Sequence, residues 1–473
     1  RIYNMLSMRP DWCISRQMTW GRPIMIFYCE KCREPYWSSE TFRNVIKAVK
    51  EKGADVWFEK EASFFLSEGA VCKHCDNESF VKEEDIVDVW FDSGVSWAAV
   101  CKKRPELKYP TDMYLEGSDQ HRGWFHSSLL TSVGNEGYAP YKTVLTHGFV
   151  VDGAGRKMSK SLGNVIAPDE IIEKYGAEIL RLWVTYEDYR DDIKISKDII
   201  NRLIETYRRI RNTLRFLHAN INDDFNPKTD AVRYEKFSYL DKWMMSRLNM
   251  LIEKVLKAYN NYSFHAIYHS LHNFCAVDLS ALYLDIVKDR IYVESKNSTK
   301  RRASQTVMFE TLVSFVKLLA PVLSYTAEEM WLYLKGNVEE ESVFLTTFPR
   351  VEKEYMSGEL EEEWSRIWEL RELINKKIEE KRVEKVIGHS LDTKVIVTVP
   401  EKEYLLLNKL GDELKEIVIV SQIELRQGDD VNVAVMRADG EKCQRCWQYT
   451  TDMVDSEKFP RVCKRCESIL SSL

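Results

Sequence analysis

The chain has 473 residues, long enough for several separately folded domains. Lys and Arg total 68 against 74 Asp and Glu, a formal net charge of -6, so a nucleic-acid partner would have to bind localised basic faces. No run of about 18 apolar residues occurs, which argues against a membrane span, and the first residues lack the apolar stretch of a secretory signal.

Eight of the eleven cysteines fall into four C-x-x-C pairs, which in a long enzyme-like chain indicates bound zinc in a reducing cytoplasm rather than disulfides. The first two pairs could place four thiolates tetrahedrally around one zinc ion. Idle thiols are the alternative, and a redox role is weaker because no thioredoxin-like pattern surrounds the pairs. The four residues of this first set are Cys29, Cys32, Cys72 and Cys75.

Residues 85–151 alternate apolar runs with glycine-containing turns, as expected of parallel strands that hold a ligand at their carboxyl ends. Residues 112–119 read as a strand that runs into a glycine turn and would present Glu116 and Asp119 beside a groove. Carboxylates there could accept hydrogen bonds from ribose hydroxyls or from an ammonium group. On the residues alone, a helix cap or a solvated turn explains each acid more simply.

A glycine-punctuated loop follows, with the sequence Lys157-Met158-Ser159-Lys160-Ser161. Glycines on both sides permit such a loop to close around a ligand and to open again. The two lysines supply point charges to a phosphate. The pattern suits phosphoryl or nucleotidyl transfer, whereas a lone K-x-x-K would by default be a solvated basic turn.

Together with two upstream blocks, this loop resembles the class I aminoacyl-tRNA synthetases, and the isoleucyl type in particular. The blocks are Asp88-Val-Trp-Phe-Asp-Ser-Gly-Val-Ser-Trp97 and Tyr114-Leu-Glu-Gly-Ser-Asp-Gln-His-Arg-Gly-Trp-Phe-His126. Segment 9–21 is similar to the point where the family's chain returns from its inserted editing domain, so most of that insertion is expected to be absent. The family's H-x-G-H motif is absent too. Ile387-Gly388-His389 matches its last three positions, but Val386 stands where the motif has its first His, and the motif must come before the lysine loop.

The resemblance implies roles for individual residues. Lys157 and Lys160 would neutralise the leaving pyrophosphate, with magnesium assisting. Trp90 and Trp124 would wall the pocket for an aliphatic side chain, although core packing is the ordinary fate of each tryptophan. The ATP and adenylate site would be lined by Glu116, Gly117, Asp119, Gln120, His147, Val150 and Lys160.

Around Ser196 the sequence changes to long amphipathic helices. Similar patterns follow and predict a bundle of four or more helices, which resembles the family's anticodon-binding domain. Five arginines lie on the polar faces of the first helix. This pattern is typical of a helix that faces RNA and equally of an ordinary solvated basic face. The later helices are expected at roughly 238–259, 263–292 and 301–334, the last interrupted by Pro321.

Residues 358–382 read as a charged helix, followed by short strands at 394–399, 416–420 and 431–435. The chain then closes with two tight C-x-x-C pairs, each with an Arg inside, and this spacing predicts tetrahedral zinc. Below roughly 40 residues a metal must replace apolar burial. The ligands would be Cys443, Cys446, Cys463 and Cys466, and the basic residues that suit phosphate contacts are Arg445, Arg461, Lys464 and Arg465.

These patterns predict four parts with different folds. They are an α/β partial Rossmann-type nucleotide-binding core at 1–195 with a zinc-knuckle insertion at 29–75, an all-α anticodon-binding helix bundle at 196–357, a small α+β module at 358–440 and a C-terminal zinc finger at 441–473.

The resemblance implies an isoleucyl-type, ATP-dependent ligase of the cytoplasm, which forms isoleucyl-adenylate and passes the acyl group to tRNA(Ile), with zinc and Mg²⁺ as cofactors and no membrane partner. Because the H-x-G-H half is missing, we expect the chain to be inactive alone and to need an N-terminal half, from the missing part of the chain or from another polypeptide. Two alternatives stay open: a tRNA-binding module without catalysis, or a valyl or leucyl enzyme.

Overall fold

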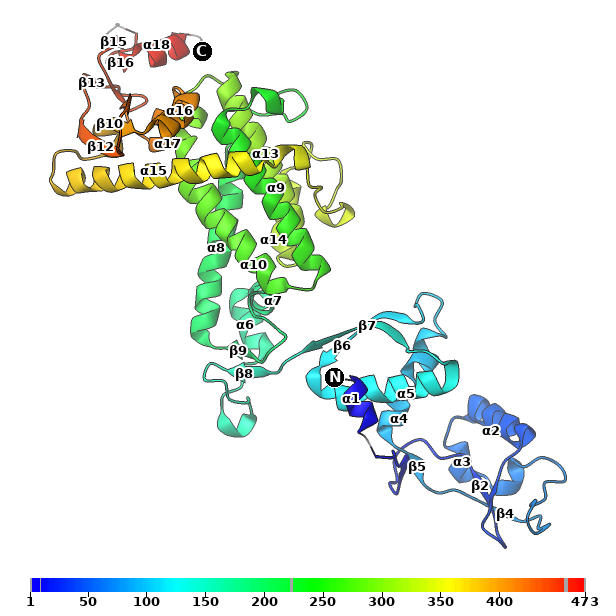
Figure 1. The fold of residues 1–473 in the computed structure, drawn as a ribbon. Coiled ribbons are helices and arrows are strands. Elements are labelled where there is room, and N and C mark those ends of the chain that lie inside the picture. Colours follow the sequence, from blue (N-terminus) through cyan, green and yellow to red (C-terminus); the bar gives the residue numbers. More distant parts are fainter. Residues whose placement is uncertain (1, 9, 222–223, 455–457, 472–473) are drawn as a thin grey trace. The chain divides into compact units, whose positions relative to one another are not determined.

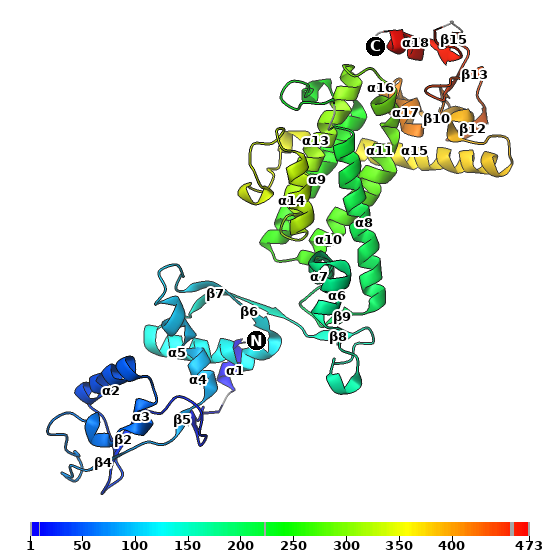
Figure 2. The same cartoon turned by 180° about the vertical axis from the view of Figure 1, so that it is seen from behind.

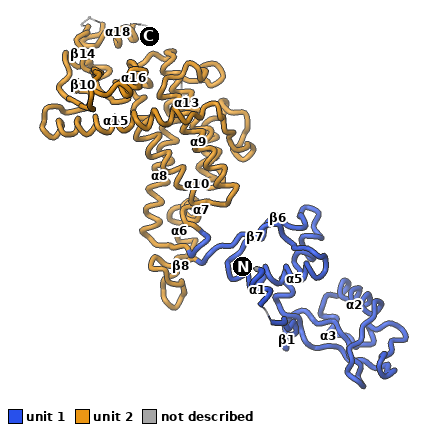
Figure 3. Tube along the Cα trace, in the orientation of Figure 1, with its two compact units in different colours: residues 1–149, 189–192 blue, residues 150–188, 193–473 orange. Residues whose placement is uncertain are grey.

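The computed structural model describes residues 2–8, 10–221, 224–454 and 458–471. Arg9, the first residue of the segment that is similar to the return from an editing domain, lies outside them. The chain forms two compact units, residues 1–149 with 189–192 and residues 150–188 with 193–473 (Figure 3). This division falls inside the segment 1–195, so the four-part domain scheme stays a prediction.

Unit 1 contains a zinc-knuckle region with a small antiparallel sheet of strand order β3-β2-β4. Its helices pack on this sheet because their apolar faces join one buried cluster that includes Phe27, Trp57 and Phe65. Ser38 begins the first of these helices by accepting a hydrogen bond from the backbone N–H of Thr41. The elements are β2 (Phe27–Cys29), β3 (Pro35–Tyr36), α2 (Ser39–Lys52), α3 (Val56–Glu59) and β4 (Phe80–Lys82).

The rest of unit 1 is built on two parallel strands joined by a helix, as the sequence predicts. Helices α4 and α5 lie close together, since a Cβ on Gly94 would come within 2.9 Å of Ser127 Cβ. The elements are α1 (Ile2–Ser7), β1 (Ser15–Arg16), β5 (Ile86–Val87), α4 (Val89–Gly94), β6 (Thr111–Gly117), α5 (Trp124–Glu136) and β7 (Tyr141–His147).

Unit 2 opens with a second parallel pair, β8 (Val150–Asp152) and β9 (Ile193–Ile195). Two helices follow the lysine loop, α6 (Pro168–Tyr175) and α7 (Ala177–Tyr186). The break lies at Gly176, whose φ of 87° is left-handed and favours glycine.

Long helices form the bundle of unit 2 (Figures 1 and 2). The first begins where the sequence predicts, because Ser196 accepts a hydrogen bond from the N–H of Ile199. The single helix expected over 263–292 is instead interrupted by a π-helical segment at Phe274–Tyr283. The helices are α8 (Lys197–Ala219), α9 (Tyr239–Asn260), α10 (Phe264–Asn273), α11 (Leu284–Ile286), α12 (Lys288–Tyr292), α13 (Thr299–Leu319) and α14 (Ser324–Tyr333).

The small module has a three-stranded sheet in which the central strand β10 pairs in parallel with β11 and antiparallel with β12. The strand predicted at 416–420 is wrong, because these residues end a helix and the strand follows at 422–427. A short apolar, β-branched run is ambiguous between strand and buried helix. The elements are α15 (Gly358–Val383), β10 (Thr393–Val399), α16 (Glu401–Leu410), α17 (Glu413–Val418), β11 (Gln422–Gln427) and β12 (Asn432–Arg437).

The last segment consists of two short antiparallel strand pairs and a helix around the terminal cysteines. Its elements are β13 (Glu441–Lys442), β14 (Tyr449–Thr450), β15 (Met453–Val454), β16 (Val462–Cys463) and α18 (Lys464–Ser471). Throughout the described ranges, the helices are all too short or too polar to cross a membrane.

Candidate functional site

The carboxyl ends of β6 and β7 bring several predicted site residues together in unit 1. The parallel register pairs Gly117 with His147 and places Glu116 beside Thr146. A Cβ on Gly117 would lie 2.6 Å from Asp119 Oδ1. The same Cβ position lies 3.8 Å from His147 Cε1, so the Asp119 carboxylate folds back over the strand end next to the imidazole of His147.

The two predicted pocket tryptophans lie beside the same turn. A Cβ on Gly123 would come within 2.9 Å of the Trp90 ring and 2.5 Å of Gln120 Oε1. The same Gln120 oxygen accepts a hydrogen bond from the backbone N–H of Trp124 at 3.0 Å. The turn thus draws Trp90, Gln120 and Trp124 into one group, and Gly123 permits their close approach.

Trp124 and Trp90 differ in how firmly they are held. The Trp124 ring stacks on Tyr114 with centroids 4.1 Å apart, and its indole N–H donates to Ser93 O at 3.1 Å. These contacts hold the Trp124 ring in place, although the residue is only half-buried. Trp90 remains 42% exposed and offers an apolar face at the surface of unit 1.

Asp88 supports this group, although the motif containing it predicts no separate role for it. Its carboxylate is buried, accepts a hydrogen bond from the Trp90 N–H at 3.0 Å, and pairs with Arg16. Trp12 also donates to Asp88 at 3.1 Å. An aspartate directly before an apolar helical turn is an N-cap signal that could have indicated this position.

The lysine loop of unit 2 is organised by Asp152, the last residue of β8. Its Oδ1 accepts hydrogen bonds from the N–H groups of Ala154 and Arg156, and its Oδ2 accepts from Asn164 Nδ2 at 3.0 Å. The hydrogen bond from Asn164, followed by that from the Arg156 backbone, holds the pKa of Asp152 far below its ordinary value. The carboxylate therefore stays ionised and ties the two sides of the loop together.

Asn164 fixes the loop from its other end. Its Oδ1 accepts from the Ser159 N–H at 2.9 Å, and its Nδ2 also donates to Lys157 O at 3.2 Å. Ser159 in turn accepts from the Leu162 N–H. The backbone is held by these contacts, whereas the Lys157 and Lys160 side chains are exposed and make no ion pair among the residues that the structure describes.

The predicted nucleotide-site residues therefore form two groups, one in each compact unit. Sequence reasoning missed Asp152 and Asn164, which position the loop without belonging to its motif. Their types offered a signal, because Asp and Asn commonly cap turns beside glycine. The first group is Trp90, Glu116, Gly117, Asp119, Gln120, Trp124 and His147, and the second is Val150, Lys157 and Lys160.

The first cysteine set brings four sulfur atoms within 4.8 Å of one another. Cys29 Sγ lies 3.5 Å from Cys75 Sγ, and Cys32 Sγ lies 3.5 Å from Cys72 Sγ. Burial opposes ionisation, but backbone N–H groups of Cys32 and Lys31 lower the pKa of Cys29 to about 6. Four soft donors of which one is readily ionised fit zinc.

The terminal set has the same dimensions and is buried at all four positions. Cys443 Sγ accepts a hydrogen bond from the Cys463 N–H at 3.3 Å. Against burial, backbone N–H groups of Cys446, Cys463 and Arg445 lower the pKa of Cys443 to about 6. This set also fits tetrahedral zinc.

The structure corrects one expectation about the finger's basic residues. Arg465 pairs with Asp289 and Arg445 donates to Val293 O, so both are bound to the bundle instead of facing solvent for phosphate contacts. Arg461 is 62% exposed, and Lys464 is exposed as well. Spacing within a C-x-x-C pair does not reveal which way the intervening side chain points.

Three family models match the chain in sequence order. "tRNA synthetases class I (I, L, M and V)" matches residues 1–196, "Anticodon-binding domain of tRNA ligase" matches 241–397, and "Zinc finger found in FPG and IleRS" matches 440–469. These matches confirm the predicted fold class and the zinc finger.

The chain is similar over its whole length to proteins named isoleucine–tRNA ligase. The chain is 50% identical to that of Syntrophotalea carbinolica over 100% of its own length and 52% of the relative's. It is 51% identical to that of Geobacter sulfurreducens, over 98% of the chain and 51% of the relative. The chain thus spans about half the length of the relatives it matches.

Among solved structures, the chain is similar to the LeuRS–tRNA–LeuAMS complex from Agrobacterium radiobacter, with a TM-score of 0.53, 17% identity, and coverage of 92% of this chain and 53% of that one. This likeness concerns the fold. The three family models and the sequence relatives lead to one conclusion: the chain belongs to the class I aminoacyl-tRNA synthetase family, and its relatives there are isoleucine–tRNA ligases.

Proposed function

We propose that this chain carries the lysine-loop half of an isoleucine–tRNA ligase, which activates L-isoleucine with ATP and transfers it to tRNA(Ile) in the cytoplasm. The observation that carries the proposal is the lysine loop itself. Its backbone is fixed by Asp152 and Asn164, while Lys157 and Lys160 are left without partners among the described residues. Two free cations on a preorganised turn suit the negative charge that develops when pyrophosphate leaves.

The group at the ends of β6 and β7 supports the other half of the proposed reaction. Glu116 and Asp119 can accept hydrogen bonds from the amino acid's ammonium group or the ribose hydroxyls, and His147 lies beside them. The exposed face of Trp90 offers an apolar wall for a branched side chain. Magnesium bound with ATP would supply further charge neutralisation.

Transfer RNA is proposed as the partner of the bundle and the finger. A hollow of about 510 Å³ between α8 and residues 280–288 is lined by Arg208, Arg209 and Lys288. Two acids line it as well, Glu205 paired with Arg208 and Asp285 paired with Lys288, which leaves Arg209 as the cation there that forms no ion pair with the described residues. Arg461 and Lys464 add exposed positive charge on the finger. Such localised basic groups can bind phosphates although the whole chain is acidic.

The test is ATP–pyrophosphate exchange with isoleucine in a protein that joins this chain to the N-terminal half present in its relatives. Lys160→Ala should slow exchange about 100- to 1,000-fold, because a preorganised charge that stabilises the leaving group is lost. Lys174→Ala is the matched control, since Lys174 lies on α6 outside the loop, where it contacts the Tyr175 ring. An unchanged exchange rate in Lys160→Ala would contradict the proposed role.

The same assay separates the alternatives. We expect no exchange from residues 1–473 alone, and activity of the isolated chain would show that no further half is needed. A tRNA-binding module without catalysis predicts no exchange even after the N-terminal half is supplied. Competition among isoleucine, valine and leucine then decides the amino acid, with isoleucine expected to be preferred.

A further inference from the structure

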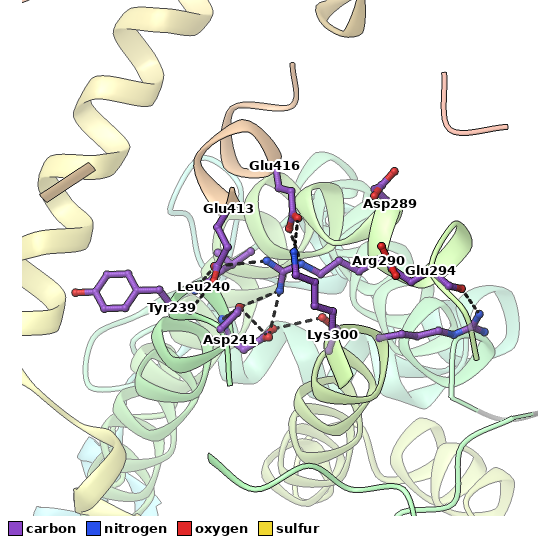
Figure 4. A network of polar contacts seen from close by, with 12 residues as sticks. Tyr239, Leu240, Asp241, Asp289, Arg290, Glu294, Lys300, Glu413 and Glu416 are labelled. Carbon is purple, nitrogen blue, oxygen red and sulfur yellow. Dashed lines mark hydrogen bonds and ion pairs between the residues drawn. The ribbon is translucent and has the colours of Figure 1, made fainter. Parts of the chain in front are cut away.

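Helix α12 is held in place by Arg290, which is 1% exposed. Its Nη1 lies 3.2 Å from Asp241 Oδ2 on α9, and its Nε donates to Glu416 Oε2 at 2.8 Å on α17 (Figure 4). Its Nη2 lies 3.5 Å from Glu413. One buried guanidinium therefore fixes α12 to the bundle and to the small module at once.

The preceding residue, Asp289, reaches a different partner. Figure 4 shows its carboxylate directed away from the carboxylates that surround Arg290. Its two oxygens accept hydrogen bonds from Nη1 and Nη2 of Arg465, both at 2.8 Å. This paired geometry is the strongest arrangement that Arg and a carboxylate can form, and the Asp289 side chain is only 20% exposed.

A second arginine of the finger is bound to the same turn. Arg445 Nη2 donates to Val293 O at 2.6 Å. Val293 is 7% exposed and packs in one buried cluster with the four terminal cysteines. Arg445 lies between Cys443 and Cys446, just as Arg465 lies between Cys463 and Cys466, so each cysteine pair encloses an arginine that is bound to residues 289–293.

We propose that Asp289 is a supporting residue of the finger's zinc site, although it lies outside the finger. By holding Arg465, it fixes the orientation of the turn between Cys463 and Cys466 and so prepares these two sulfurs for the metal. Residues around metal ligands commonly act in this way. Because linkage is reciprocal, zinc binding must then also strengthen the attachment of the finger to α12.

The test is the rate at which the full chain loses zinc to a chromogenic chelator, together with hydrogen exchange of residues 443–454. Asp289→Asn keeps the size of the side chain but removes the nearer of the two carboxylate charges at Arg465, the other being Glu294, whose Oε1 lies 3.6 Å from Arg465 Nη1. We expect loss of the finger's zinc to become about 10- to 100-fold faster. Zinc at Cys29, Cys32, Cys72 and Cys75 should leave at the wild-type rate and serves as an internal reference.

Asp285→Asn is the matched control. Asp285 pairs with Lys288 at 2.8 Å, one turn before Asp289, and its side chain is 41% exposed. Asp285→Asn removes the same charge near Asp289. Within the described residues, neither Asp285 nor Lys288 forms an ion pair with the finger. This variant should lose zinc like the wild type.

A double variant checks that the effect passes through Arg465. If it does, Asp289→Asn combined with Arg465→Gln should lose zinc no faster than Arg465→Gln alone. Multiplying effects, or a wild-type rate in Asp289→Asn, would overturn the proposal. Faster hydrogen exchange in α9 of the Asp289 variant would also count against it, because the loss would then reflect loosening of the bundle.

Discussion

The two cysteine sets have the same four donors but stand in different surroundings. The first lies against a large buried cluster of its own unit, in which the Phe27 and Trp57 rings have centroids 5.0 Å apart. The terminal set has, among the described residues, only Val462 as a fully buried apolar neighbour of its own, and Val293 comes from the bundle. The same metal chemistry therefore supplements a core in one place and replaces it in the other.

This difference assigns different energetic roles to zinc. Where a segment has almost no apolar core, the free energy of metal binding is the free energy of folding. Where aromatic side chains are already buried, each contributes its own stabilisation and the metal adds to the total. The finger should depend on zinc and on its attachment to α12, whereas the knuckle region should depend largely on itself.

The largest expected effect comes from removing one ligand in each set. Cys466→Ser and Cys29→Ser are matched, since both cysteines are 0% exposed. Cys466→Ser should abolish hydrogen-exchange protection in residues 443–454, because structural zinc contributes about 10–16 kcal/mol in isolated fingers. Cys29→Ser should lose its zinc but keep protection in α2. Native mass spectrometry would check that each variant retains one of two zinc ions.

The comparison fails if α2 exchanges as fast in Cys29→Ser as the finger does in Cys466→Ser. That result would mean that the cluster around Trp57 forms only when the metal is bound. The two segments would then differ in composition alone, not in their dependence on zinc.

A smaller effect is expected from the core of the knuckle region itself. Trp57 is 0% exposed, and its indole N–H donates to Glu83 O at 2.9 Å. Trp57→Ala should destabilise this region by about 3–5 kcal/mol even with zinc bound, through lost burial and the cavity left behind. Hydrogen exchange in α2 measures the change. Trp37→Ala, at a position 71% exposed, should have little effect.

Local patterns in the sequence were enough to locate the two cysteine sets, the lysine loop and most helices. Cysteine spacing and the Ser196 cap act over a few residues, so their outcome depends little on the rest of the chain. The prediction of a strand at 416–420 is wrong because the segment ends a helix, whose last turn is set by the left-handed backbone of Ile419 and by burial of its apolar residues within the module. No local pattern relates Asp289 to Arg465, since 176 residues separate them.

The smallest expected effect on stability comes from the two carboxylates of α17 that bind Arg290, Glu413 and Glu416. Glu416 accepts from Arg290 Nε at 2.8 Å and from Lys300 at 3.0 Å, whereas Glu413 accepts from the backbone N–H groups of Tyr239 and Leu240 (Figure 4). Burial alone would raise the pKa of Glu416, but Arg290 and Lys300 lower it. Burial raises the pKa of Glu413.

Glutamine resembles a protonated glutamate. Because the pKa of Glu416 is lowered and that of Glu413 is raised, the two substitutions are expected to cost different amounts of stability. Glu416→Gln should cost about 1–3 kcal/mol at neutral pH, and Glu413→Gln less than about 1 kcal/mol. The lowered pKa of Glu416 stabilises the fold above the unfolded value of 4.5, and this stabilisation is lost as the pH falls from 4.5 through the lower pKa of the folded state. The wild type and Glu416→Gln should therefore converge below the folded-state pKa. Because α12 carries the finger, Glu416→Gln should also speed hydrogen exchange in residues 443–454 and leave α2 unchanged. Equally faster hydrogen exchange in both segments would contradict this comparison, because the knuckle region would then depend on the bundle as much as the finger does.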